Sequence, residues 1–412
     1  MRACCVPTPW MGGVLMFLDG YRMVDMCWMG GGPFTAQVLG DLGFDVIKVM
    51  EVPGNSGRRA GPSTGSLIAR NNGVQMSHYR FGMRNARCIQ LDLKSKQGLE
   101  VFHRLIEKTD VITEGFRPGV ADRLGVGYEA LKKINPRLVY AAITGYGQTG
   151  PYRDKPGHDV NFESIAGFIG MNGRAGGPPV VTGGLVADFA VGAMSAVTHI
   201  LAALLRRAKT GQGAYCDVSL TDAVFVTNTA ASGPYLGAGV EMQRGEMYFS
   251  GFWPFNDVYE TRDGAYISLG AWEPYFFGNL CEAVQREDLI ELQWVVEKRD
   301  HVRAELGALF RTRTQAEWVA LFEHVDACVT PVNTPAQAAN DPQMRARDMV
   351  VELEHPIHGK VPMVGSMFKL DGQVLEARHW MNRPGEHTAM VLAELGYSEG
   401  EIADLRAQGL IA

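Results

Sequence analysis

Residues of types that transfer protons follow a glycine-rich turn late in the first half of the chain. Gly157 is followed by His158 and Asp159, which begin a helical pattern running to Ile169. Because an imidazole titrates close to neutral pH, a histidine at an exposed helix start is suited to general-base catalysis. By residue type alone, such a histidine is more often one that caps or packs against its helix.

Carboxylates follow two later turns. Asp188 comes after the glycine-rich segment 176–184 and directly before a long apolar helix, and Glu273 stands where a strand meets a helix. Both positions are typical of an N-cap, because a carboxylate there accepts hydrogen bonds from the first-turn amides. The position of Asp188, beside free backbone N–H groups, is equally compatible with a base or a nucleophile.

The elements that must position these residues alternate between strands and helices in the first half of the chain. This rhythm is typical of a mostly parallel, doubly wound sheet. After residue 220 the patterns change to an antiparallel strand pair and short helices. The sequence thus predicts an α/β protein with a large Rossmann-like domain and a smaller α+β domain. Strands of the large domain are expected at 21–28, 45–50, 88–91, 110–113 and 138–144.

The turn after the first predicted strand partly matches the dinucleotide-binding fingerprint. Gly30 and Gly32 fit its first two glycines, but Thr35 stands where the third belongs;. Glu51 lies about where a ribose-binding acid would stand, although strand ends commonly carry such residues. We therefore expect a Rossmann-type topology without nicotinamide or flavin binding.

Charge and composition argue against several other classes of protein. The 39 basic and 45 acidic residues give a net charge of -6, which disfavours a nucleic-acid binder;. The seven cysteines include no C-x-x-C pair, as in a reduced, cytoplasmic protein without structural zinc;. The uncharged segment 189–205 is too short for a membrane span and is predicted to be a buried helix. The segment 48–123 has 13 basic and 7 acidic residues, which indicates either a solvated face or a site for a polyanionic small molecule;.

Nearly the whole chain from about residue 17 resembles the family III CoA-transferase superfamily, and within it the α-methylacyl-CoA racemases. The racemase resemblance rests on 157–159 and on Glu273 with Pro274, which the transferases generally lack. It implies that His158 and Asp188 are two bases on opposite faces of an acyl-CoA α-carbon, with Glu273 orienting His158 and Asp159 as a helper. The superfamily resemblance rests on the segments 40–48, 91–95, 114–119, 144–151 and 385–388.

Two alternatives remain open. In a family III CoA-transferase, Asp188 would attack the thioester as a nucleophile. A non-catalytic acyl-CoA-binding homologue is the other alternative.

The resemblance also implies a binding site for coenzyme A, which is part of the substrate, and no metal or further cofactor. An arginine expected near the end of the second strand is replaced around Met50 and Glu51, so an arginine of the insertion that follows is expected to substitute. The candidates are Arg58, Arg59, Arg70, Arg80 and Arg84. The expected coenzyme A ligands are Leu91, Asp92, Leu93, Lys94, Gly115, Phe116, Arg117, Arg123, Gly157, Val160, Asn161 and Phe162.

The fold implied by the resemblance is an interlaced homodimer whose active site is shared between the large domain of one subunit and the small domain of its partner. We expect a large domain at 17–218, completed by 346–412, a linker helix at 219–239 and a small domain at 240–345. The residues before Met16 are predicted to be a dispensable extension. No nucleic-acid or membrane partner is expected, and the predicted location is the cytoplasm.

Overall fold

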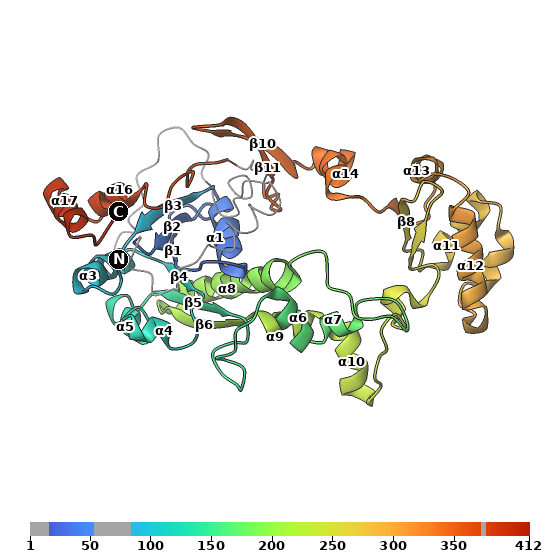
Figure 1. Ribbon diagram of the computed structural model, residues 1–412, viewed down its shortest axis with the longest axis horizontal. Coiled ribbons are helices and arrows are strands. Elements are labelled where there is room, and N and C mark those ends of the chain that lie inside the picture. The colour runs from blue at the N-terminus through green and yellow to red at the C-terminus, as the bar shows by residue number, and fades with distance from the viewer. Residues whose placement is uncertain (1–15, 53–83, 372–375) are drawn as a thin grey trace. The chain divides into compact units, whose positions relative to one another are not determined.

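The computed structural model describes residues 16–52, 84–371 and 376–412, which form two compact units (Figure 1). The first unit combines the described residues up to 166 with 184–227 and 348–412. The second unit combines 167–183 with 228–347. The domain boundaries drawn from the resemblance stay a prediction. Residues 1–15 and Arg58, Arg59, Arg70 and Arg80 lie outside the described residues.

The first unit contains a six-stranded sheet in which every neighbouring pair is parallel, in the order β3-β2-β1-β4-β5-β6. This is the order of a doubly wound Rossmann sheet, so the predicted α/β fold class is confirmed. The order reverses between β1 and β4, where such sheets bind ligands outside the carboxyl ends of their strands. The strands are β1 (Arg22–Asp25), β2 (Asp45–Met50), β3 (Ala86–Gln90), β4 (Val111–Glu114), β5 (Val139–Thr144) and β6 (Ala214–Ser219).

The first strand is shorter than predicted, because a buried carboxylate turns the chain at its carboxyl end. Asp25 accepts hydrogen bonds from the backbone N–H of Cys27 and the hydroxyl of Thr113, each at 2.9 Å. It also forms a 2.6 Å ion pair with Lys48, whose ammonium donates to the Cys27 carbonyl as well. These bonds end β1 at Asp25 rather than at Trp28, and the chain leaves the sheet toward the helix α1 (Gly31–Asp41).

Helices cover both faces of this sheet. The helix α1 packs against β1, β2 and β3, and α8 packs against β5, β6 and α1. On the other face, one apolar core joins the strands to α3, α5, α16 and α17. The helical elements of the unit are α1 (Gly31–Asp41), α3 (Lys96–Ile106), α4 (Val120–Arg123), α5 (Tyr128–Ile134), α6 (Asp159–Ile165), the π-helix η2 (Val186–Ala193), α8 (Met194–Thr210), α9 (Leu220–Thr227), α16 (Thr388–Glu394) and α17 (Glu399–Ala407).

The apolar segment predicted as a buried helix continues from η2 into α8. Among the described residues, Val186–Thr210 is the one helix long and apolar enough to cross a membrane by length and composition. One face of α8, including Ile200 and Leu204, is buried against the sheet, whereas Leu205 is 69% exposed. Its packing on β5 and β6 is therefore that of a helix with one buried face.

The end of the chain returns to the first unit and completes it. The Arg378 guanidinium donates to the carbonyls of Gly40 at 2.7 Å and Gly43 at 3.0 Å, at the end of α1. Next to β3, the backbone N–H of Asp92 donates to the Leu410 carbonyl at 2.9 Å. The returning segment also carries the antiparallel hairpin of β10 (Val350–His355) and β11 (Gly359–Val364).

Arg84 takes part in this assembly rather than in phosphate binding. Its side chain is 1% exposed, and its guanidinium forms hydrogen bonds of 3.0 and 2.7 Å with the two carboxylate oxygens of Asp41. A third bond of 2.7 Å goes to the Val364 carbonyl. Because these bonds occupy the guanidinium inside the protein, the expectation that Arg84 substitutes for the arginine replaced near the end of the second strand is wrong.

The second unit is the predicted smaller α+β unit. Its three-stranded antiparallel sheet, in the order β7-β8-β9, packs on helices through an aromatic core that includes Phe255, Phe277, Phe310 and Trp318. The elements are α7 (Phe168–Met171), α10 (Thr229–Ala238), η3 (Tyr248–Phe252), β7 (Val258–Glu260), β8 (Tyr266–Leu269), α11 (Pro274–Ala283), η4 (Glu287–Leu292), η5 (Val296–Lys298), α12 (Arg299–Phe310), α13 (Gln315–Phe322), β9 (Val329–Pro331), α14 (Pro335–Asn340) and α15 (Pro342–Ala346).

Candidate active site

Asp188 lies inside a helix rather than at its cap. The π-helix η2 begins at Val186, so its N-cap is Leu185 and Asp188 lies in its first turn. The prediction of an N-cap is therefore wrong, because the helix starts two residues before Asp188. A single π-turn within a longer helix is frequent at functional sites. Gly192 permits this turn, since a Cβ there would overlap the carbonyl oxygen of Ala187.

Asp159 connects Asp188 to the start of α6. The backbone N–H of Asp188 donates to Oδ1 of Asp159 at 2.8 Å, and Asp159 is 8% exposed. Burial, followed by the negative charge of Asp159, raises the pKa of Asp188 to about 6, and the nearby His158 opposes this shift. Asp188 is therefore mostly ionised at pH 7 but holds a proton more tightly than an ordinary carboxylate, which suits a group that accepts and returns one.

His158 is the N-cap residue of α6, and its side chain is exposed. Its backbone N–H donates to Oδ1 of Asn161 at 3.0 Å, so Asn161 holds the start of the helix. Gly157 packs closely on Phe162, since a Cβ on this glycine would lie 2.6 Å from the ring. The helix ends at Ile165 instead of continuing to 169, because Gly167 adopts a left-handed conformation and starts a separate short helix.

A glycine turn lies directly against the Asp188 carboxylate. Gly30, the N-cap of α1, has φ 70° and ψ -138°, a conformation that is largely confined to glycine;. A Cβ on Gly30 would lie 2.9 Å from Oδ2 of Asp188, and a Cβ on Gly31 would lie 2.8 Å from the backbone carbonyl oxygen of Asp188. Because the two glycines have no side chain, the segment that carries Asp188 can pack directly against them. Sequence reasoning considered this turn only as a nucleotide-binding fingerprint and missed this contact.

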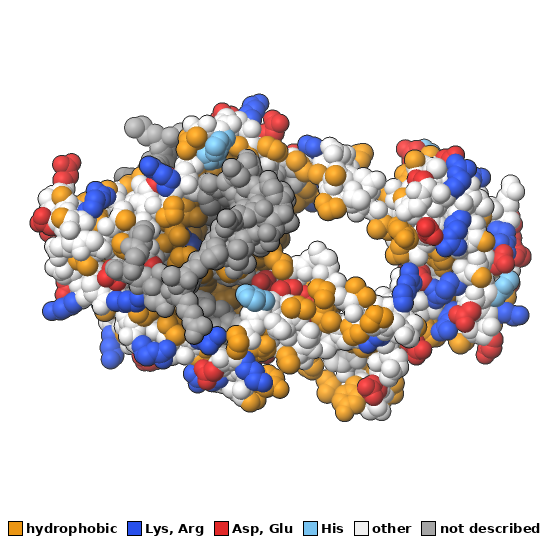
Figure 2. All heavy atoms as spheres, viewed as in Figure 1, with side chains coloured by type: hydrophobic (Ala, Val, Ile, Leu, Met, Phe, Trp, Pro, Cys, Tyr) orange, Lys and Arg blue, Asp and Glu red, His pale blue; other side chains and the backbone are white. Residues whose placement is uncertain are grey.

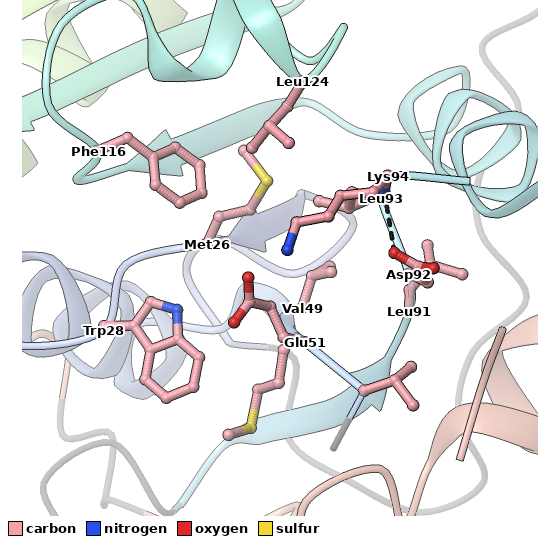
Figure 3. A pocket seen from close by; sticks show the side chains of 12 residues that line it. Met26, Trp28, Val49, Glu51, Leu91, Asp92, Leu93, Lys94, Phe116 and Leu124 are labelled. Carbon is pink, nitrogen blue, oxygen red and sulfur yellow. Dashed lines mark hydrogen bonds between the residues drawn. The ribbon is translucent and has the colours of Figure 1, made fainter. Parts of the chain in front are cut away.

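A pocket opens at the carboxyl edge of the sheet, over β1, β2, β3 and β4 (Figure 3). It holds about 530 Å³ of space, part of which is open to solvent. Five of the expected coenzyme A ligands contribute to its lining, from the loops that follow β3 and β4. The pocket is lined by Met26, Trp28, Val49, Met50, Glu51, Val52, Leu91, Asp92, Leu93, Lys94, Phe116 and Leu124.

The other expected coenzyme A ligands lie outside this lining. Gly115 and Arg117 flank Phe116 in the loop after β4, and Arg123 ends α4; all three are exposed. The remaining four surround the start of α6: Gly157, Val160, Asn161 and Phe162. The structure thus places five of the expected ligands in the pocket lining, three at exposed positions after β4 and four beside His158.

Glu273 belongs to the second unit. It is the N-cap residue of α11, followed by Pro274 at the first helical position, and its exposed side chain makes no capping hydrogen bond;. The predicted position at a helix start is correct, whereas the predicted capping bond is absent. Its pairing with His158 stays a prediction.

The first unit thus combines a sheet of Rossmann strand order, a pocket at the carboxyl edge of that sheet, and a histidine with two neighbouring carboxylates, Asp159 and Asp188. The sequence model of CoA-transferase family III matches residues 18–388, and the chain belongs to this family.

Relatives within the family carry two kinds of name. The chain is 32% identical over 404 residues to an acyl-CoA transferase of Fusarium pseudograminearum, covering 96% of this chain and 88% of the relative. It is also 32% identical over 411 residues to the α-methylacyl-CoA racemase of Mus musculus, covering 96% and 98%. The crystal structure of a CaiB/BaiF family protein from Brucella suis superimposes with a TM-score of 0.76, at 29% identity, and covers 93% of this chain and all of that one. These similarities support an acyl-CoA enzyme of this family.

Proposed function

We propose that this protein is a racemase that interconverts (R)- and (S)-2-methylacyl-CoA thioesters. The observation that carries the proposal is the connection between the two candidate bases: Asp159, the residue after His158, accepts the backbone N–H of Asp188. The negative charge of Asp159 also helps to raise the pKa of Asp188 to about 6. A histidine and a carboxylate that readily exchanges its proton are suited to a reaction that needs two bases.

In the proposed mechanism, one base removes the α-proton from one face of the α-carbon while the other, already protonated, delivers a proton to the opposite face. One C–H bond breaks and one C–H bond forms at the same carbon, so the substrate loses one proton and gains one. The reaction therefore requires no oxidant and no co-substrate. The negative charge that develops on the thioester oxygen is stabilised by backbone N–H groups at the start of α6. Glu273 would orient His158 and stabilise its charged form.

Coenzyme A, as part of the substrate, would occupy the pocket at the carboxyl edge of the sheet. Leu91–Lys94 and Phe116 line that pocket, and the positive charge of Lys94 suits a phosphorylated ligand;. The proposed reaction uses no metal and no further cofactor.

A family III CoA-transferase is the second candidate function. The chain is as similar to the Fusarium transferase as to the Mus musculus racemase, at 32% identity to each, which favours this candidate. In that reaction the Asp188 carboxylate would attack the thioester carbonyl, expel coenzyme A as thiolate and form an acyl-aspartyl anhydride. A substrate-dependent mass increase on Asp188, trapped with hydroxylamine, would identify this reaction.

The deciding experiment incubates (R)- and (S)-2-methylacyl-CoA separately with the protein in deuterated water. A racemase forms the other enantiomer and incorporates deuterium at the α-carbon. A transferase instead moves coenzyme A to an added carboxylic acid and leaves the α-proton in place. A non-catalytic acyl-CoA-binding homologue does neither, although it still binds coenzyme A.

We predict that Gly30→Ala disturbs the reaction through Asp188. The added methyl would meet the carboxylate at about 3 Å and displace it, and a displacement of this kind costs about 10²-fold in rate;. The acid limb of the pH–rate profile should shift, because the surroundings of Asp188 change. Gly150→Ala is the matched control, since Gly150 also has a positive φ but no atom near the new methyl. Equal rates and equal profiles for the two variants would contradict the prediction.

We also propose that the protein is an interlaced homodimer in the cytoplasm, without a membrane or nucleic-acid partner. Hydrophobic side chains are exposed over α10 (Figure 2), among them Tyr235 and Leu236, and a second copy would cover them;. The five cysteines that the structure describes are free thiols, as expected for a reducing compartment;.

We predict that the His158→Ala and Glu273→Ala chains restore activity when they are co-expressed. If Glu273 serves the His158 of the partner subunit, a mixed dimer contains one intact site and one site with both lesions. Differently tagged chains, purified as mixed dimers, should then recover up to about half of the wild-type rate. Mixed dimers without activity would place the two residues of each site in the same chain.

A further inference from the structure

Glu51 is a carboxylate in the pocket that the proposed reaction does not use. It directly follows β2, and its side chain points into the same space as the Lys94 ammonium (Figure 3). Its Oε2 atom is enclosed by the protein, and none of the described residues offers it a hydrogen bond. Because an enclosed carboxylate oxygen without a donor costs free energy, this atom is suited to receive a donor from a ligand.

The backbone around Glu51 is fixed by β3. The Glu51 carbonyl accepts a hydrogen bond from the Gln90 side chain at 3.1 Å, and the Leu91 N–H donates to the Met50 carbonyl at 2.9 Å. Met50 itself pairs with Gln90 in the sheet. The backbone that carries the Glu51 side chain is therefore held at a defined place on the pocket wall, and a rigid support of this kind favours selective recognition.

The chemistry of a carboxylate limits what it can recognise. An ionised carboxylate only accepts hydrogen bonds, so it pairs with a hydroxyl or an N–H group and repels a phosphate. In dinucleotide-binding domains with this strand order, an acid about twenty residues beyond the first glycine binds a ribose hydroxyl. Glu51 stands at that place in the sheet, after the second strand. Coenzyme A carries a phosphate on its ribose 3′ oxygen, so the 2′ hydroxyl is its free ribose hydroxyl.

We propose that Glu51 accepts a hydrogen bond from the 2′ hydroxyl of the coenzyme A ribose and so determines how the nucleotide end of the substrate is seated. This inference rests on the proposed use of coenzyme A thioesters. Lys94 provides a positive charge in the same pocket, which offsets the repulsion between the Glu51 carboxylate and the phosphates of the ligand;.

The test measures the dissociation constants of coenzyme A and 2′-deoxy-coenzyme A by calorimetry on the full chain. The wild type should bind the deoxy ligand about 10-fold more weakly, as expected for a lost hydrogen bond to a charged group. Glu51→Ala should bind coenzyme A about 10-fold more weakly than the wild type and should no longer distinguish the two ligands. Glu51→Gln keeps an acceptor of the same shape and should retain part of the discrimination.

Glu129→Gln is the control, because it removes the same charge from an exposed position on α5. It should leave both dissociation constants unchanged. The proposal is overturned if Glu51→Ala binds coenzyme A as tightly as the wild type or more tightly, or if it still discriminates against the deoxy ligand. A wild-type protein that binds no coenzyme A would instead contradict the proposed function itself.

Discussion

Racemisation by the His158→Ala variant is expected to be slower than that of the wild type by about 10²- to 10⁴-fold, the usual contribution of a positioned general base. The imidazole is exposed, and Asn161 holds the start of α6 through the backbone N–H of residue 158, which the substitution leaves in place. The fold and the affinity for coenzyme A should therefore survive. Deuterium incorporation at the α-carbon measures the rate, and calorimetry measures the affinity.

His324→Ala is the control for this experiment, because His324 is an exposed histidine elsewhere on the chain. It should retain the wild-type rate. If His158→Ala also retains most of the activity, His158 is not one of the two bases, and the racemase proposal fails.

Asp188→Asn is expected to abolish activity and at the same time to stabilise the protein at neutral pH. The pKa of Asp188 is raised from 3.8 to about 6, so the folded chain binds this proton more tightly than the unfolded chain does. Ionisation of Asp188 therefore costs stability as the pH rises from about 4 to about 6. An asparagine has no charge to bury. The melting temperature of the variant relative to the wild type should rise across this interval and then stay constant.

Thermal unfolding between pH 4 and pH 8 checks this prediction. Asp404→Asn is the matched control, since Asp404 is an exposed aspartate on α17 whose carboxylate is in contact with water. The difference in melting temperature between Asp404→Asn and the wild type should not rise between pH 4 and pH 6. A pH-independent difference for Asp188→Asn would show that Asp188 is not held at a cost in free energy.

The sheet was largely predictable from the sequence, because its buried strands are short apolar, β-branched segments between glycine turns. The strand β2 has the predicted bounds, Asp45–Met50. The end of β1 was missed because it depends on Asp25, whose carboxylate bonds to Thr113 in another strand. The order of the strands in the sheet could not be predicted from hydrophobic periodicity. Periodicity describes the alternation of residues within one strand, whereas the order depends on which strands pair.

The site was less predictable than the sheet, because its geometry depends on contacts between distant segments. The residue types of His158, Asp159 and Asp188 signalled proton transfer. The contact between Gly30 and Asp188 joins residues far apart in the sequence, so no local pattern indicates it. The start of η2 was misplaced because a π-turn has no hydrophobic period of its own.

The return of residues 410 and 411 to β3 imposes an order on biosynthesis. The strand β3 is the edge of the sheet, and its continuation at Leu91 and Asp92 pairs with Ile411 and Leu410. Ribosomes add about 5–20 residues per second, so this edge emerges roughly 16 to 64 s before its partner is made. For that time the nascent chain presents an open strand edge, the kind of surface that pairs with other chains. The second unit is complete by residue 347 and is free to fold before the first unit closes.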